Sequence, residues 1–175
     1  MQPRTFDWAE INALRTTGFR GFTALGACFG PFVTLVSPGD TDLRRQDFMW
    51  EATVWHEYVH VLTLGLSKHR VPRWLTEGFS VYEEGQRERT FERGMDRELF
   101  DAFHNRDIPP VRLLNRLFRG ERILFGYYQG GLIVDLIQRD FGFDKAIELL
   151  RAFGDDLDTE DAFQRALLRL APRLA

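Results

Sequence analysis

Hydrophobic residues recur at helical spacing through most of the chain after residue 47. The run 47–66 is apolar on nearly all of its sides, a pattern typical of a buried helix. Asp47, Pro72 and Thr159 are suitable residues for the starts of three helices. The remaining amphipathic patterns predict helices at about 72–84, 95–105, 111–118, 126–140, 143–153 and 159–170.

The pattern ahead of residue 47 is different. Residues 5–17 have helical spacing, and glycines end that segment. Residues 19–37 contain two short β-rich runs closed by a Ser-Pro-Gly-Asp turn, which predicts a hairpin. We therefore expect an α+β fold with a small N-terminal antiparallel sheet packed on a mostly helical body. The length of 175 residues fits a single domain spanning 1–175.

Composition narrows the possible partners. The formal net charge is −3, so no basic field favours nucleic acid or an anionic membrane. We expect neither a secretory signal nor a transmembrane helix, because the N-terminus lacks an apolar run and no stretch approaches 18 apolar residues. The one cysteine excludes an internal disulfide framework. We expect Cys28 to be a small buried residue, with metal ligation by its thiolate as the minor alternative. The compartment stays open.

Residues 56–60 read His-Glu-Tyr-Val-His and carry the clearest chemistry in the chain. On a helix, His56 and His60 lie one turn apart on one face and can share a metal ion, most often zinc. Glu57 can lean over the open coordination position and accept a proton from water on the metal. The alternative is a pair of surface histidines. The apolar helix argues against it, because buried imidazoles and carboxylates need partners that a metal supplies.

Two further glutamates follow on the next predicted helix. Glu77 comes 16 residues after His60, enough for the first helix to end and the second to return across the metal. Two histidines and one glutamate leave a fourth position for water, as expected of a catalytic zinc site. The alternative for Glu77 is a carboxylate favoured by the start of its helix. Glu84 lies at nearly the same helical azimuth and is either a residue that orients a ligand or a solvated side chain.

These residues resemble the gluzincin zinc metallopeptidases, the broad group of thermolysin and the aminopeptidase N family. The resemblance is closest to bacterial peptidase MA-like domains, which are often attached to tetratricopeptide repeats. It covers most of the chain. The blocks that carry it are Gly-Ala-Cys-Phe-Gly at 26–30, Trp-His-Glu-Tyr-Val-His-Val at 55–61, Val-Pro-Arg-Trp-Leu-Thr-Glu-Gly-Phe-Ser-Val-Tyr-Glu-Glu at 71–84, and Tyr-Tyr-Gln-Gly-Gly at 127–131.

The resemblance implies a zincin-type catalytic domain in which His56, His60 and Glu77 hold one Zn²⁺ and Glu57 is the general base. Tyr128 matches the tyrosine that donates a hydrogen bond to the tetrahedral intermediate in the aminopeptidase N family. Tyr127 is the alternative donor, and a purely structural tyrosine at the helix start is another interpretation. Tetratricopeptide or other domains are possible partners in a longer parent chain.

The departures from that group refine the expected function. The stretch 26–30 lacks the acidic residue that anchors a substrate's free amine in the aminopeptidases, so an endopeptidase is favoured over an aminopeptidase. Thr76 stands where that family often has Asn. We therefore expect a zinc-dependent metallopeptidase that acts on a peptide or protein substrate. The alternatives are a catalytically inactive zinc-binding domain that serves as a protein-interaction module, and a metal-free helical interaction protein.

Overall fold

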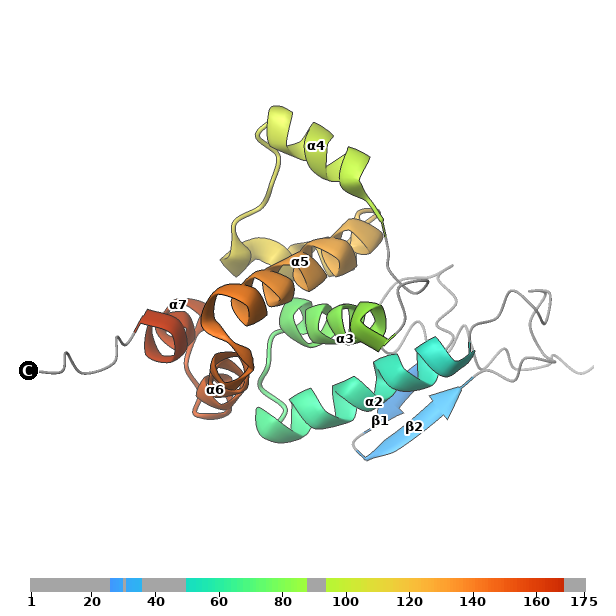
Figure 1. Cartoon of the computed structure of the whole chain (residues 1–175), viewed down its shortest axis with the longest axis vertical. Helices are drawn as coiled ribbons and strands as arrows, with labels where there is room; N and C mark the ends of the chain where they lie inside the picture. The colour runs from blue at the N-terminus through green and yellow to red at the C-terminus, as the bar shows by residue number, and fades with distance from the viewer. Residues whose placement is uncertain (1–25, 30, 36–49, 88–93, 169–175) are drawn as a thin grey trace, which may run out of the picture.

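The elements of the fold come from a computed structural model, which describes residues 26–29, 31–35, 50–87 and 94–168 (Figure 1). The predicted helix at 5–17 and the start of the predicted helix at 47–66 lie outside these ranges. The elements are β1 (Gly26–Phe29), β2 (Phe32–Leu35), α2 (Trp50–Leu66), α3 (Arg73–Arg87), α4 (Asp96–His104), the 3₁₀ helix η2 (Val111–Arg119), α5 (Ile123–Phe141), α6 (Phe143–Gly154), α7 (Thr159–Phe163) and the π-helical turn η3 (Gln164–Leu168).

The two strands form an antiparallel hairpin beside α2 (Figure 1). Gly26 pairs with Leu35 and Cys28 with Val33, so the register brings the start of β1 opposite the end of β2. A mostly helical body with a small two-stranded antiparallel sheet near the N-terminus confirms the predicted α+β class. None of the helices in the described part of the chain is long and apolar enough to cross a membrane.

Helix α3 lies at the centre of the helical body, between α2 and α5 (Figure 1). It crosses α5 where Gly78 meets Gly130. A Cβ atom added at Gly78 would lie 2.5 Å from the carbonyl oxygen of Gly130, and one added at Gly130 would lie 2.7 Å from that of Trp74. Contacts this short leave no room for a side chain. The two glycines therefore let the helix backbones touch, which fixes the start of α5 against the helix that carries Glu77.

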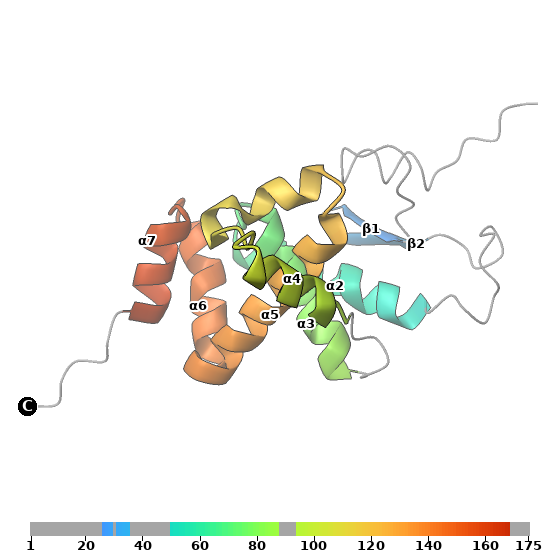
Figure 2. The ribbon, with the colours of Figure 1, turned by 90° about the horizontal axis from the view of Figure 1, so that it is seen from above.

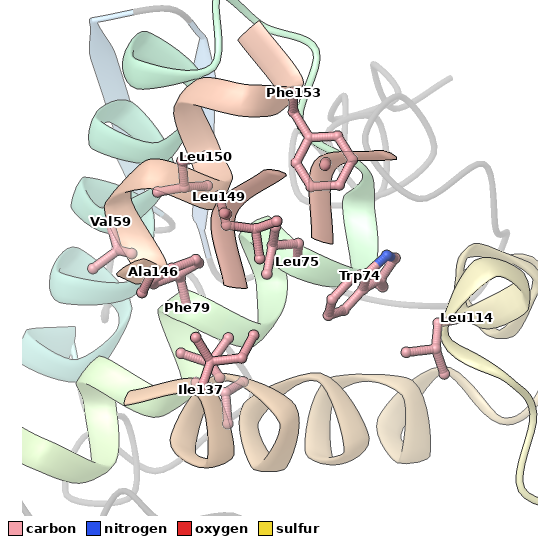
Figure 3. Close-up of a cluster of buried hydrophobic side chains, with 14 of the residues drawn as sticks. Val59, Trp74, Leu75, Phe79, Leu114, Ile137, Ala146, Leu149, Leu150 and Phe153 are labelled. Atoms are coloured by element: carbon pink, nitrogen blue, oxygen red, sulfur yellow. The ribbon is translucent and has the colours of Figure 1, made fainter. Parts of the chain in front are cut away.

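The hydrophobic core fills the space between α3, α5 and α6 (Figure 3). Trp74, Leu75 and Phe79 contribute the buried face of α3, and α6 contributes Leu149 and Leu150. Core side chains in close contact hold their helices at fixed distances, since interiors are packed as densely as organic crystals. The core thus holds one side of α3 against α5 and α6, and the opposite side of α3 faces α2.

The connection between α2 and α3 turns the chain back sharply. Lys68 and His69 both adopt left-handed backbone conformations, with φ of 51° and 62°, and the N–H of His69 donates to the carbonyl of Leu64. The Asn115 side chain then caps α3 by accepting a hydrogen bond from the Trp74 N–H at 2.9 Å. This turn brings α3 back alongside α2, so that Thr63 and Thr76, which are 13 residues apart in sequence, become neighbours.

The prediction that α2 is buried on all sides is wrong. Tyr58 and Leu62 are 46% and 48% exposed, whereas the polar His56 and His60 are each 8% exposed. The hairpin covers one side of α2 and α3 another, and the side that carries Tyr58 and Leu62 faces outward. Hydrophobicity along the sequence could not show which side meets α3, because apolar residues occupy both the buried and the outward faces.

Most of the other predicted helices are found with boundaries shifted by a few residues. The start of α7 differs in its cap: the Asp158 carboxylate, not Thr159, accepts from the backbone N–H of Asp161. Helix α4 contributes only Ala102 to the buried set, and it lies on the far side of α5 from α2 (Figures 1 and 2).

Candidate metal centre

Three potential metal ligands converge between α2 and α3. The Nε2 atoms of His56 and His60 each lie 3.2 Å from Oε2 of Glu77. The two imidazole rings stand edge to face with centroids 4.8 Å apart. All three residues are buried, each less than a tenth exposed. One ligand atom from each of the three residues lies within 4.8 Å of the other two. In the part of the chain that the structure describes, this is the group of histidine and carboxylate side chains that could hold a metal ion.

Each histidine has a hydrogen-bond partner on its other ring nitrogen. Nδ1 of His56 lies 2.7 Å from Oε1 of Glu84, and Nδ1 of His60 lies 2.8 Å from the Thr76 hydroxyl. A carboxylate can only accept, so His56 carries a proton on Nδ1. Such partners orient a ligating imidazole and direct the lone pair of Nε2 toward the metal. Glu84, whose role the sequence left open, is thus buried against His56, not solvated.

The second oxygen of Glu77 is also engaged. Arg73, one turn earlier on α3, donates from Nε to Oε1 of Glu77 at 3.2 Å. The guanidinium of Arg73 also lies over the ring of Phe118, 5.2 Å from its centroid. Because Oε1 is held by Arg73, Oε2 is the oxygen that Glu77 presents to the two histidines. Sequence reasoning missed Arg73, although its spacing of four residues ahead of Glu77 was visible.

The geometry and donor chemistry of this cluster fit zinc. Ligand bonds of about 2.0–2.1 Å in a tetrahedral arrangement place neighbouring donor atoms roughly 3.3 Å apart. The two measured separations from Oε2 of Glu77 are both 3.2 Å. Two imidazoles and a carboxylate are also donors that zinc accepts, and outer hydrogen-bond partners are already present. The donor types and both separations from Glu77 therefore fit a zinc ion held by His56, His60 and Glu77.

Mutual contacts shift the protonation of these residues in the metal-free cluster. Burial lowers the pKa of His56, but hydrogen bonds to Glu77 and Glu84 outweigh it and raise that pKa to about 9. For Glu77, burial acts to raise the pKa, whereas the charge of His60 and the hydrogen bonds from both histidines hold it well below its ordinary value. The cluster without metal is thus an ion pair between a carboxylate and a protonated imidazole.

Glu57 lies beside the cluster and against β1. It is buried, and burial is the main cause that raises the pKa of its carboxyl group, partly opposed by the charges of His56 and His60. A Cβ atom added at Gly26 would lie 2.7 Å from Cγ and 3.0 Å from Oε1 of Glu57. The absence of a side chain at Gly26 is therefore what allows the Glu57 carboxyl group to occupy its position.

The two candidate tyrosines on α5 lie in different surroundings. The Tyr128 hydroxyl donates a short hydrogen bond to the Asp96 carboxylate at the start of α4. Burial, that hydrogen bond and the charge of Asp96 raise the pKa of Tyr128 to about 12. The ring of Tyr127 instead lies beside the cluster, 6.2 Å from the His56 ring between centroids. Of the two, Tyr127 is the tyrosine in contact with a candidate ligand.

The remaining chemically interesting side chains lie apart from the ligand group. Cys28 is half-buried, and burial together with the charge of Glu57 raises the pKa of its thiol. His69 is exposed in the turn after α2, and His104 is exposed at the end of α4. Three hydroxyl residues to which sequence reasoning gave no role at the site, Thr63, Thr76 and Ser80, are buried around the histidines. Polar residues within apolar helices were the available signal for them.

Comparison of the chain with protein-family models, with curated proteins and with solved structures found no match. The function is therefore inferred from the chemistry of the cluster and of the residues around it.

Proposed function

We propose that this chain is a zinc-dependent metallopeptidase that hydrolyses peptide bonds. The observation that carries the proposal is the convergence of two imidazole Nε2 atoms on one carboxylate oxygen at 3.2 Å, with the buried carboxyl group of Glu57 beside them. Three protein ligands and a neighbouring carboxylate are the composition of a catalytic zinc site; a structural site usually closes with four protein ligands.

The three ligands and Glu57 would have different roles: the ligands would hold the metal, and Glu57 would transfer a proton. A zinc ion held by His56, His60 and Glu77 would polarise a substrate carbonyl and lower the pKa of water towards about 7. Glu57 accepts a proton as the water oxygen adds to the carbonyl carbon, and it returns that proton to the nitrogen as the C–N bond breaks. The raised pKa of Glu57 suits this exchange, since a base works best with a pKa near the working pH.

The substrate we propose is an internal segment of a peptide or protein. An enzyme that measures a free N-terminus needs an acid near the cleft to pair with the amine, and the residues of β1, Gly-Ala-Cys-Phe, contain none. The exposed Phe32 of β2 and the half-exposed Phe29 of β1 offer apolar surface close to α2 for an extended chain. The inference that the enzyme is an endopeptidase depends on this lack of an acid.

A second candidate function is a zinc-binding interaction module without catalysis. The observation that favours it is the Tyr128 hydroxyl, the candidate donor to an oxyanion, which is engaged by Asp96. Without a donor aimed at the developing charge, hydrolysis would lose one stabilising contact, which commonly contributes about 10²–10³-fold to the rate. Tyr127, which lies beside His56, is the residue that would have to supply it.

The first test is metal content, followed by hydrolysis. We expect about one zinc per chain by elemental mass spectrometry, and much less in Glu77→Ala, because that variant removes the oxygen shared by both histidines. Cleavage of a mixed peptide library, followed by mass spectrometry, should stop with a chelator and return with zinc. Failure of the wild-type chain to take up zinc at neutral pH would overturn both candidate functions.

A pair of variants on α2 separates catalysis from metal binding. Glu57→Gln should retain zinc and lose hydrolysis, because an amide cannot carry the proton. Glu51→Gln, an exposed position in the first turn of the same helix, serves as the control and should behave like the wild type. Zinc uptake without hydrolysis of any peptide would favour the interaction module, and wild-type hydrolysis by Glu57→Gln would refute the peptidase mechanism.

A further inference from the structure

A chain of hydroxyl groups lies behind His60, on the side away from Glu77. Nδ1 of His60 is 2.8 Å from Oγ1 of Thr76, and Oγ1 of Thr76 is 2.6 Å from Oγ1 of Thr63. Oγ1 of Thr63 in turn lies 3.0 Å from the carbonyl oxygen of Val59. Thr63 and Thr76 are 3% and 7% exposed, so water does not compete for these bonds. This series of hydrogen bonds runs from His60 on α2 to Thr76 on α3 and back to Thr63 on α2.

The number of available protons sets the direction in which these hydrogen bonds are donated. A carbonyl oxygen can only accept, so the bond to Val59 uses the proton of Thr63. Thr63 must then accept from Thr76, and that bond uses the proton of Thr76. With both hydroxyl protons committed, Nδ1 of His60 has to be the donor at the start of the chain. The reverse direction would lose the bond to Val59 and place the imidazole proton on Nε2, where it can donate to Glu77 in the metal-free cluster. Zinc on Nε2 removes that proton, so in the metal-loaded site the direction from Nδ1 through Thr76 to Thr63 is the one that keeps every bond.

We propose that Thr63 and Thr76 form a relay of hydroxyl groups that positions His60 as a metal ligand. When zinc binds Nε2, the relay accepts the proton that the neutral imidazole keeps on Nδ1 and so holds the ring with Nε2 directed at the metal. Thr63 and Thr76 are positioning residues, since they act through His60 and not on a substrate. The inference rests on the proposed metal site, and it adds residues to that site that the ligand spacing does not reveal.

The relay also makes the two histidines unequal. His56 is backed by a carboxylate, Glu84, whereas His60 is backed by neutral hydroxyl groups that end at a backbone carbonyl. Ser80 does not replace the relay: its hydroxyl donates to the backbone carbonyl of His56 at 2.9 Å and lies 3.5 Å from Nδ1 of His60, at the limit of a hydrogen bond. The orientation of His60 therefore depends on Thr76, and that of Thr76 on Thr63.

The test is zinc affinity, measured by competition with a chromophoric chelator. Thr63→Val keeps the side-chain shape and removes the hydroxyl, and we expect it to weaken zinc binding about tenfold. Thr76→Val removes the direct partner of His60 and should weaken binding by about 10–100-fold. Thr63→Ser restores a hydroxyl and should recover most of the affinity. Zinc affinity is measured for both valine variants, so the proposal stays testable if one of them does not fold.

The chain provides a matched control in Ser67→Ala. Ser67 is fully buried directly after the end of α2, and its hydroxyl donates to the Thr63 carbonyl at 2.7 Å, the same kind of bond to a carbonyl four residues earlier. The Ser67 hydroxyl donates to the backbone carbonyls of Thr63 and Leu64. A general cost of losing a buried hydroxyl would weaken zinc binding equally in Ser67→Ala and Thr63→Val, and that result would overturn the relay.

A second readout follows the proton itself. Nitrogen-15 NMR of the histidine rings in the zinc-loaded wild type should show His60 with a proton on Nδ1 and zinc on Nε2. Metal bound through Nδ1 of His60 would overturn the relay even if the protein is an active peptidase. Zinc binding that depends on Thr63, in a chain that hydrolyses no peptide, would support the relay and leave only the proposed catalysis refuted. No zinc binding by the wild type would overturn both.

Discussion

Gly26→Ala should disable catalysis while it leaves the metal in place. The added Cβ atom would lie 2.7 Å from Cγ of Glu57 and 2.8 Å from Cγ2 of Thr53. Carbon atoms in contact prefer about 3.5–4.0 Å, so β1 or the Glu57 side chain must move by about 1 Å. A displacement of that size at a reacting group can cost about 10²-fold in rate. The three atoms nearest to the added Cβ belong to Glu57 and Thr53, and none of them belongs to a candidate ligand.

The assay compares kcat/KM for a cleaved peptide with the zinc content of the same preparation. We expect kcat/KM to fall by about 10²-fold with one zinc retained per chain. Gly65→Ala is the control, because it lies on α2 and a Cβ atom there meets nothing within 4 Å. Alanine is a better helix former than glycine, so the control should be more stable by about 0.5–1 kcal/mol and equally active.

Wild-type activity in Gly26→Ala would refute the reasoning, since it would mean that Glu57 does not need its present position. Loss of zinc along with activity would refute it differently, by showing that β1 supports the ligands as well as the base. A fall in kcat/KM accompanied by unfolding would be visible as a lowered melting temperature, and the zinc-loaded melting curve is therefore recorded for each variant.

Three other perturbations test the packing, the ligand support and the charge of the site. Gly78→Ala should destabilise the fold by about 1–3 kcal/mol in a denaturant titration, because its Cβ atom would meet the Gly130 backbone at 2.5 Å; an unchanged midpoint would contradict the helix contact. Glu84→Gln should weaken zinc binding about 10–100-fold in a chelator competition, and equal affinity would show that His56 needs no carboxylate behind it. In the metal-free chain the pKa of His56, raised to about 9, gives a stability contribution that is fully present below pH of about 6.5 and is lost as pH rises through 9. Thermal unfolding of the metal-free wild type should therefore show this loss, and His56→Gln should not.

Local features of the chain could be predicted well because they depend on residues close in sequence. The helical spacing, the hairpin and the juxtaposition of His56 with His60 all follow from periodicity over a few residues. Glu77 could be proposed as the third ligand because the segment between His60 and Glu77 is long enough for one helix to end and the next to return. The distances that join Glu77 to both histidines come from the structure, where the left-handed turn at Lys68 and His69 returns α3 alongside α2.

Features that depend on the direction of packing could not be predicted in this way. Apolar residues cover both faces of α2, so the sequence did not show that Tyr58 and Leu62 face outward. The same limit left Glu84 undecided between a buried partner and a solvated side chain. It also left Tyr127 and Tyr128 nearly equivalent, because one step along a helix rotates a side chain by about 100° and only the position of α5 decides which ring meets His56.

The charges of the site account for the competition between protons and metal. Glu57, Glu77 and Glu84 bring three carboxyl groups into a buried region, and the guanidinium of Arg73 offsets only one negative charge. Uncompensated buried charge is costly, so the metal-free chain makes up the difference with protons. The pKa of His56, raised to about 9, is one place where it does so, and burial shifts the pKa of Glu57 in the same direction. A divalent zinc ion with neutral histidines would balance the remaining two charges. Zinc binding should then release the proton of His56, and the charge of the metal would favour the ionised form of Glu57.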